Sequence, residues 1–170
     1  MALSPLIDAT PEEVRTLLAP LRGDYSVAVC GENPFATGAI IRAAHNFLAR
    51  ELILVGGGTF YEKASMGMEK YETLVEVPDE EAFFRHVGDR PIYAVEKDAA
   101  TMEVTDVERF PSGVVFVFGS ERNGVPSAIL ARATCVLGIP IYGVNHSLPV
   151  AVAAGIVLHE WARRHFRGVR

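Results

Sequence analysis

The chain has 170 residues, 49% of them hydrophobic and 22% charged, which suits one compact soluble domain and excludes a disordered or low-complexity chain. Its formal net charge of −5 argues against a nucleic-acid binder that depends on a broad basic face. No charged segment followed by an apolar stretch opens the chain, and the apolar run 150–158 is too short to span a bilayer. We therefore expect a cytoplasmic protein without a membrane anchor.

The apolar pattern predicts alternating helices and strands. Thr10 and Pro11, with two acids after them, predict a capped helix at the start. In chain order, the expected elements are a helix at 10–21, a strand at 26–30, a helix at 37–50, a strand at 51–56, a helical turn within 60–67, an extended piece at 71–77, a helix at 78–88, strands at 91–96 and 113–119, a helix at 126–133, a strand at 134–140 and a helix at 147–166. Continuous apolar strands between helices indicate an α/β fold with an open, mostly parallel sheet and helices on both faces.

The cysteines and histidines show no metal-binding pattern. Cys30 and Cys135 each lie in an apolar run and in no CxxC or Cys/His cluster, so we interpret them as buried reduced thiols, with a disulfide or a metal site as the alternatives. His45 and His159 lie in apolar helical stretches and are expected to be packing or surface residues. No metal is expected.

The chain ends in the basic sequence RRHFRGVR, which has no acidic residue. Its arginines are Arg163, Arg164, Arg167 and Arg170. Two interpretations remain open, a solvated chain end and a tail that contacts phosphates.

Ligands of open α/β sheets bind beyond the carboxyl ends of the strands. Four loops rich in glycine and polar residues occupy such places, at 31–38, 56–59, 119–124 and 139–147. The loop GGGT lacks the GxGxxG spacing, and the chain contains neither GxxxxGK[ST] nor GxSxG. Dinucleotide, P-loop and serine hydrolase sites are therefore not favoured.

Three segments taken together resemble the ordered motifs of a known family. NPFATGAIIRAA (33–44), GSERNGVPSAIL (119–130) and IPIYGVNHSLPVAVAAGIVLHEW (139–161) are similar to the motifs of the SpoU-type branch of the SPOUT RNA methyltransferases. SMGMEK (65–70) resembles a segment between the first two. The resemblance covers residues 25–165.

The resemblance implies a homodimer that uses S-adenosylmethionine to methylate a ribose 2′-hydroxyl of tRNA or rRNA. It also implies a single domain over 1–170, with a helical extension at 1–24 and a deep trefoil knot in the cofactor-binding region 113–166. The cofactor positions it implies are Gly119, Ser120, Glu121, Ile139, Ile141, Ser147 and Leu148. Gly119, Gly124 and Gly143 would allow close backbone approach and positive φ, and Pro140 would join the apolar residues around an adenine. Glu121 would either bridge to the partner subunit or be a solvated loop acid.

Arg42 occupies the position of the family's motif-one arginine. At the ligand end of its helix and close to the cofactor loops, its fork of donors could hold a phosphate and so position the ribose. The alternative is a surface arginine that covers an apolar helix face. We expect the catalytic region to contain Arg42, Glu121 and Ser147, and RNA contacts from Arg42 and Arg122.

The chain departs from the family pattern around this site. Ala36 stands six residues before Arg42 where the family has asparagine, and Pro149 replaces the asparagine of Ser-Leu-Asn. The other two departures are Ala43, usually threonine, and Ala151, commonly serine. Asn145 and His146 are hypothesised to compensate for the lost amides, and alanine substitution of both tests this.

The leading function is thus an S-adenosylmethionine-dependent RNA methyltransferase. The alternative is a SPOUT-fold protein that binds cofactor or RNA with impaired catalysis, which the missing asparagines favour. A methyltransferase for a base atom or a protein is a third possibility.

Overall fold

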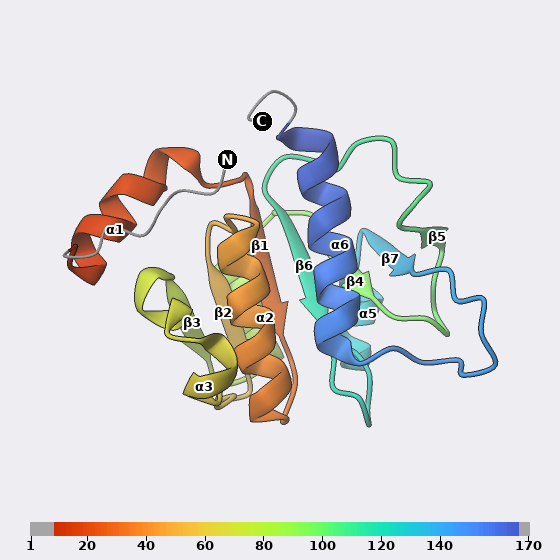
Figure 1. Cartoon of the computed structure of the whole chain (residues 1–170). Coiled ribbons are helices and arrows are strands. Elements are labelled where there is room, and N and C mark those ends of the chain that lie inside the picture. Colours follow the sequence, from red (N-terminus) through yellow and green to blue (C-terminus); the bar gives the residue numbers. More distant parts are fainter. Residues whose placement is uncertain (1–8, 167–170) are drawn as a thin grey trace.

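The computed structural model describes residues 9–166 of the chain. Its centre is one seven-stranded sheet in which all neighbouring strands are parallel. In order across the sheet, the strands are β3 (Leu74–Val77), β2 (Leu52–Val55), β1 (Tyr25–Val29), β6 (Val114–Phe118), β4 (Ile92–Val95), β7 (Cys135–Gly138) and β5 (Met102–Glu103) (Figure 1). The predicted open, mostly parallel α/β sheet is confirmed.

Helices cover both faces of this sheet. The helices of residues 9–166 are α1 (Pro11–Leu18), α2 (Pro34–Asn46), α3 (Glu62–Ser65), α4 (Glu80–Val87), α5 (Ser127–Arg132) and α6 (Val150–His165), with 3₁₀ turns η1 (Ala19–Leu21) and η2 (Met68–Tyr71), and those on the sheet are α2, α4, α5 and α6. Successive strand residues point to opposite faces, so alternate residues of β1, β2 and β6 enter two cores. One core packs against α2 and α6, which lie side by side in Figure 1, and the other packs against α4 and α5.

Capping residues decide where two of the helices begin. Thr10 caps α1 as predicted, because its hydroxyl accepts from the Glu13 amide while the Glu13 carboxylate accepts from the Thr10 amide. In α2 the side chain of Asn33 accepts from the amides of Phe35 and Ala36, at 3.1 and 3.4 Å. The helix therefore starts at Pro34 rather than at the predicted residue 37, and it ends at Asn46.

Two further elements differ from the predictions. Helix α6 begins at Val150, three residues later than predicted, because Pro149 has the extended backbone of an N-cap. The two-residue strand β5 has no apolar pattern and was not predicted. Its exposed residues are extended because they pair with Leu137 and Gly138 of β7.

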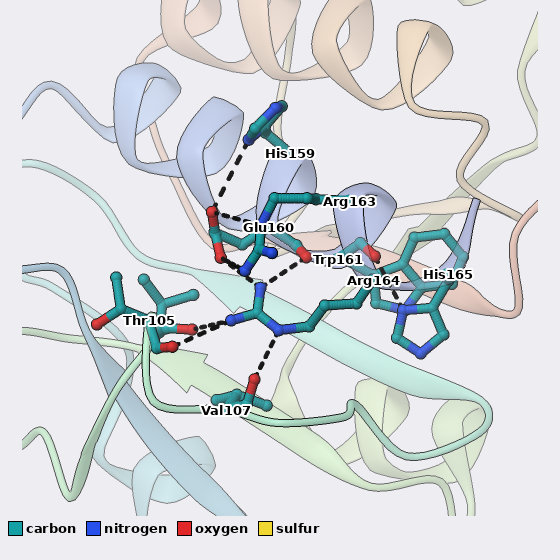
Figure 2. Close-up of polar contacts among 9 residues, drawn as sticks. Thr105, Val107, His159, Glu160, Trp161, Arg163, Arg164 and His165 are labelled. Carbon is teal, nitrogen blue, oxygen red and sulfur yellow. Dashed lines mark hydrogen bonds and ion pairs between the residues drawn. The ribbon is translucent and has the colours of Figure 1, made fainter. Parts of the chain in front are cut away.

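Arg164 fixes the C-terminal half of α6 to the segment that joins β5 and β6 (Figure 2). Its side chain is 6% exposed, pairs with the Glu160 carboxylate, and donates to the carbonyl oxygens of Val107 and Thr105 at 2.6 and 3.1 Å. Arg163 also pairs with Glu160, at 3.0 Å. The guanidinium of Arg164 is thus buried and bonded within the fold, so neither a solvated chain end nor a phosphate-contacting tail describes this residue. Arg167 and Arg170 lie outside the described residues.

The structure also bears on the expectations about the cysteines, a metal site and a membrane span. Cys30 and Cys135 are free and half-buried, and burial, helped by the nearby Glu80 carboxylate, raises the pKa of the Cys30 thiol to about 12. Within residues 9–166, no cluster of three or more His, Cys, Asp or Glu could hold a metal ion. Over the same residues, no helix combines the length and the apolar character needed to cross a membrane.

Glu51 connects the start of β2 to α4 and to β1. Its carboxylate accepts from Arg90 at 2.7 Å, from His86 at 3.0 Å and from the Ser26 hydroxyl at 3.0 Å. Burial opposes ionisation, but these bonds outweigh it and hold the pKa of Glu51 below its usual value of 4.5. The ionised carboxylate therefore stabilises the fold above pH 4.5.

We expect Glu51→Gln to lower the free energy of unfolding at pH 7 by about 1–3 kcal/mol, because charge-assisted hydrogen bonds are lost. The folded pKa is depressed, so this difference should shrink as the pH falls below 4.5 and through the folded value. Urea denaturation of both proteins from pH 7 to pH 3 measures it. A difference that stays constant over this range would contradict the assignment.

Candidate functional site

The principal cavity lies at the carboxyl ends of β4, β6 and β7, with a volume of about 930 Å³. These three strands are neighbours in the sheet, so the loops that follow them meet at one edge. The lining residues fall in the ranges 95–99, 118–125 and 144–148, together with Leu130, Leu137, Ile139, Ile141, Val150 and Ala153. All seven predicted cofactor positions are among them.

The loop after β6 is a tight turn that depends on two glycines. The Ser120 amide donates to the Gly124 carbonyl at 3.2 Å, and the Gly124 amide returns a bond to the Ser120 carbonyl at 2.9 Å. A Cβ on Gly119 would lie 2.0 Å from the Gly124 carbonyl carbon, and Gly124 has φ of +67°. The positive φ expected at Gly124 is therefore present, whereas Gly119 has none and needs glycine because the backbone of Gly124 and Val125 closes against it.

Gly143, the third glycine of that prediction, has a different environment. No heavy atom lies within 4 Å of a Cβ built there, and its φ is not in the positive region. The expectation of a positive φ at Gly143 was wrong, and Gly143 is not among the residues that line the cavity.

Glu96 is a cavity residue that sequence reasoning missed. It follows β4, and its carboxylate accepts from the Val125 amide at 3.1 Å. A Cβ on Gly124 would lie 2.3 Å from the same oxygen. Glu96 thus joins the β4 and β6 loops beneath the cavity. Its position in the sequence could have identified it, because Glu96 ends the predicted strand 91–96 and ligands bind beyond the carboxyl ends of such strands.

The loop between β7 and α6 provides the opposite wall. Ile139, Ile141 and Leu148 line the cavity as half-buried apolar side chains. The Ser147 amide and hydroxyl both donate to Asn145 Oδ1, at 3.1 and 3.2 Å. Asn145 therefore shapes this loop, and Ser147 is held at the cavity wall.

Glu121 links the cavity to the start of α2. It is exposed, lines the cavity, and accepts from Asn33 Nδ2 at 3.3 Å. Arg122 is exposed at the rim of the same cavity. The loop after β1 thus reaches the site through the Asn33 side chain.

Arg42 lies away from the cavity of its own chain. It is exposed and does not line the cavity. Because α2 begins at Pro34, Arg42 is in its third turn, about 12 Å along the helix axis. The expectation that Arg42 lies at the ligand end of its helix was wrong, because Asn33 starts the helix earlier than predicted. Of the three expected catalytic residues, the structure brings together Glu121 and Ser147 only.

The glycine loop after β2 belongs to a second, smaller cavity of about 370 Å³. Its lining residues are Cys30, Gly31, Glu32, Val55, Gly56, Gly57, Gly58, Thr59, Pro78, Asp79, Glu80 and Pro126. The four predicted loops thus do not form one site. The β2 loop is separated from the main cavity because β1 and β6 lie between β2 and β4.

The departures from the expected motifs have structural consequences. Ala43 on α2 and Ala151 on α6 both pack against the core shared by these helices. Pro149 is the N-cap of α6, a place that needs no amide hydrogen. Small apolar residues at these places therefore suit the packing of α2 and α6, while none of them offers a side-chain donor.

The arrangement can hold a ligand that is partly apolar and partly polar. Its walls are branched aliphatic side chains, and its floor is the backbone of the Gly119–Gly124 turn with the Glu96 carboxylate. Backbone groups and a few polar side chains in an apolar cavity of this size are typical of small-molecule sites.

Comparisons with known proteins point to one family. Residues 27–159 match the model of the SpoU rRNA Methylase family. The chain is 35% identical over 136 residues to a 23S rRNA (adenosine(1067)-2′-O)-methyltransferase of Streptomyces laurentii, covering 75% of this chain and 50% of that protein. It is 33% identical over 116 residues to a tRNA (guanosine(18)-2′-O)-methyltransferase of Thermus thermophilus, covering 66% and 58%.

A solved structure extends the likeness to nearly the whole chain. The AdoMet-bound rRNA methyltransferase from Sinorhizobium meliloti superposes with a TM-score of 0.76 at 29% identity, covering 97% of this chain and 62% of that one. The chain therefore spans between half and two thirds of the length of these relatives.

Proposed function

Because the chain belongs to the SpoU rRNA methylase family, we propose that it transfers the methyl group of S-adenosylmethionine to a ribose 2′-hydroxyl of tRNA or rRNA. The observation that carries the proposal is the cavity at the carboxyl ends of β4, β6 and β7, to which all seven expected cofactor positions contribute. Relatives named as 2′-O-methyltransferases and an AdoMet-bound neighbour support it.

The residues of the cavity fit this cofactor. A volume of about 930 Å³ is at the upper end of the range of small-molecule sites. Ile139, Ile141 and Leu148 provide apolar walls suited to an adenine ring. Because Gly119 has no Cβ, the backbone of Gly124 can close against it and form the turn at the cavity floor. The Glu96 carboxylate beneath the turn adds negative charge beside a cofactor that carries a positive sulfonium.

When bound, S-adenosylmethionine supplies an electrophilic methyl group, so the protein's task is to align a hydroxyl and to help remove its proton. We propose that Ser147 and Glu121 orient groups at the cavity mouth. Arg42 would hold a phosphate of the RNA bidentately, which fixes the ribose next to the methyl group. An arginine stays protonated and is a poor general base, so its role would be positioning.

We further propose that the site is completed across a homodimer. The support is that Arg42 does not line the cavity of its own chain. A second copy could place its α2, and with it its own Arg42, opposite this cavity. In this arrangement one protomer provides the cofactor loops and its partner provides Arg42.

The trefoil knot and the domain limits are also kept as proposals. After β7 the chain returns to pack α6 on α2 and against the segment between β5 and β6. Most of the lining residues lie between 118 and 153, and the others are residues 95–99, which supports a cofactor-binding region mainly within 113–166 of one domain. A crystal structure traced through 96–150 tests whether this segment is knotted.

The direct test is transfer of a labelled methyl group to bulk tRNA and rRNA, followed by nuclease digestion to identify the modified nucleoside. A 2′-O-methyl nucleoside supports the proposal, and a methylated base or methylated protein would replace it. Cofactor binding without any transfer favours the second candidate, a binding protein with impaired catalysis. The observation behind that candidate is that Ala36 and Pro149 provide no amide near the site.

We propose that Asn145 and His146 partly replace those amides, since both line the cavity. Replacing both with alanine is expected to lower methyl transfer by about 100-fold, the usual cost of losing one positioned donor. Single-turnover assays at saturating cofactor measure this. Unchanged transfer in a folded double variant would dismiss their role.

A further inference from the structure

The start of α2 carries an exposed aromatic pair that the proposed chemistry does not use. Phe35 is 60% exposed and Tyr61 is 37% exposed, yet their ring centroids are only 4.5 Å apart at an interplanar angle of 46°. Large exposed aromatic side chains that touch each other commonly mark a binding surface.

The backbone holds this pair in place. The Tyr61 amide donates to the Pro34 carbonyl at 2.9 Å, and the Phe35 amide donates to Asn33. A Cβ on Gly38 would lie 2.6 Å from the Tyr61 carbonyl oxygen, so the close approach of α3 to α2 requires glycine there. Both rings therefore extend from fixed positions and lose little freedom when a ligand binds.

The pair adjoins the main cavity. Asn33 caps the turn of α2 that carries Phe35, and its Nδ2 donates to Glu121, which lines the cavity. A group that lies on the rings is thus one side chain away from the proposed cofactor site.

A cation lies on the same stripe of α2. Residues seven apart on a helix share a face, so Phe35 and Arg42 point to the same side, about 10 Å apart along the axis. The exposed or half-exposed residues of this stripe are Phe35, Ala39, Arg42 and Asn46. An aromatic ring and an arginine on one stripe suit a base and a phosphate of single-stranded nucleic acid.

We propose that Phe35 and Tyr61 form a stacking platform for an unpaired base of the RNA strand whose phosphate is held by Arg42 of the same protomer. This proposal rests on the proposed function. The base lies against the exposed face of the pair, and Arg42 contacts the backbone of the same strand. The platform would make the enzyme select a loop or another unpaired segment over a duplex.

The test compares two probes at one salt concentration, a labelled oligoadenylate of about ten nucleotides and an abasic oligomer with the same number of phosphates. Phe35→Leu keeps an apolar side chain and removes the ring. It should weaken oligoadenylate binding by about tenfold, as expected for one lost stacking contact, and leave binding of the abasic probe unchanged. Leu17→Ala, at a residue 48% exposed on α1, is the matched control and should change neither.

Three results would overturn the platform. One is unchanged oligoadenylate binding with an unchanged oligomeric state, the second is the same unchanged binding with a shift in oligomeric state by light scattering, which would place the rings against a second copy, and the third is an equal loss of binding for both probes. Phe35→Trp gives a second reading, because the native Trp161 is buried. Oligoadenylate should quench the fluorescence of the introduced indole, and the abasic probe should not. If neither probe quenches this fluorescence, the proposal is overturned.

Failure of the platform is distinguishable from failure of the proposed function. Methyl transfer by the wild-type protein together with normal oligoadenylate binding by Phe35→Leu would dismiss the platform alone. No transfer to tRNA or rRNA, with binding that still depends on Phe35, would support the platform and dismiss the enzyme.

Discussion

Replacing Arg42 with alanine is expected to slow methyl transfer by about 100-fold, the usual effect of misplacing a reacting group, and to leave S-adenosylmethionine affinity unchanged. Arg42 does not line the cavity of its own chain, so its removal alters no wall of the cofactor site. Its proposed role is to fix a phosphate of the RNA, and the ribose hydroxyl would lose its alignment without it. Single-turnover transfer and cofactor calorimetry, measured on the same protein, separate these effects.

Two further variants sharpen the Arg42 prediction. Arg42→Lys keeps the charge and loses the planar fork, so it should recover only part of the rate. Arg15→Ala removes another exposed arginine, on α1, and should leave transfer unchanged. If Arg42→Ala transfers methyl groups at the wild-type rate, Arg42 is a surface residue and the positioning role is wrong.

Gly119→Ala is expected to weaken S-adenosylmethionine binding by at least about 100-fold, or about 2.7 kcal/mol. The added Cβ would lie 2.0 Å from the carbonyl carbon of Gly124 and 2.3 Å from the Val125 amide nitrogen. These are backbone atoms, so the turn that forms the cavity floor must open. Calorimetric titration measures the loss, and circular dichroism shows whether the rest of the sheet remains folded.

Gly143→Ala is the matched control for Gly119, because both glycines follow strands at this edge of the sheet. A Cβ at Gly143 meets no atom within 4 Å, so its cofactor affinity should stay within about twofold of the wild-type value. Equal affinities for Gly119→Ala and the wild-type protein would place the cofactor elsewhere.

Mixing the two impaired variants, Arg42→Ala and Gly119→Ala, tests the composite site. If Arg42 and the cavity come from different protomers, a co-refolded mixture of Arg42→Ala and Gly119→Ala should regain about a quarter of the wild-type activity. About half of the dimers would then be mixed, and each mixed dimer has one site free of both substitutions. No recovery from mixed dimers, or a monomer by light scattering at micromolar concentration, would contradict the shared site.

The fold could be predicted well because its signals are local. Apolar runs such as 113–119 give buried parallel strands, and the Thr10–Pro11 pair marks a helix start. The helix boundaries at Pro34 and Val150 depend on how Asn33 and Pro149 orient the backbone, which apolar spacing does not report. Strand β5 has no pattern of its own, because it is defined by its pairing with β7.

Site residues that lie in recognisable motifs could be predicted from the sequence. Site residues that are brought together by the order of the strands in the sheet could not. The seven cofactor positions taken from the second and third motifs all line the main cavity, whereas Pro140 and Gly143, expected nearby, are not among its lining residues. Glu96 and the separation of the GGGT loop follow from the order of β2, β1, β6 and β4 in the sheet, which the sequence does not state. The distance of Arg42 from the cavity follows from the start of α2, so its proposed partner across a dimer could not be inferred from spacing within one chain.

The most direct test is calorimetric titration of the purified wild-type protein with S-adenosylmethionine and, separately, with S-adenosylhomocysteine. The proposed cavity, with its intact Gly119–Gly124 turn and apolar walls, predicts one site per chain with a dissociation constant on the order of micromolar, about −8 kcal/mol. The absence of binding to either molecule, by protein shown to be folded and dimeric, would contradict a methyltransferase and leave an RNA-binding relative without a cofactor.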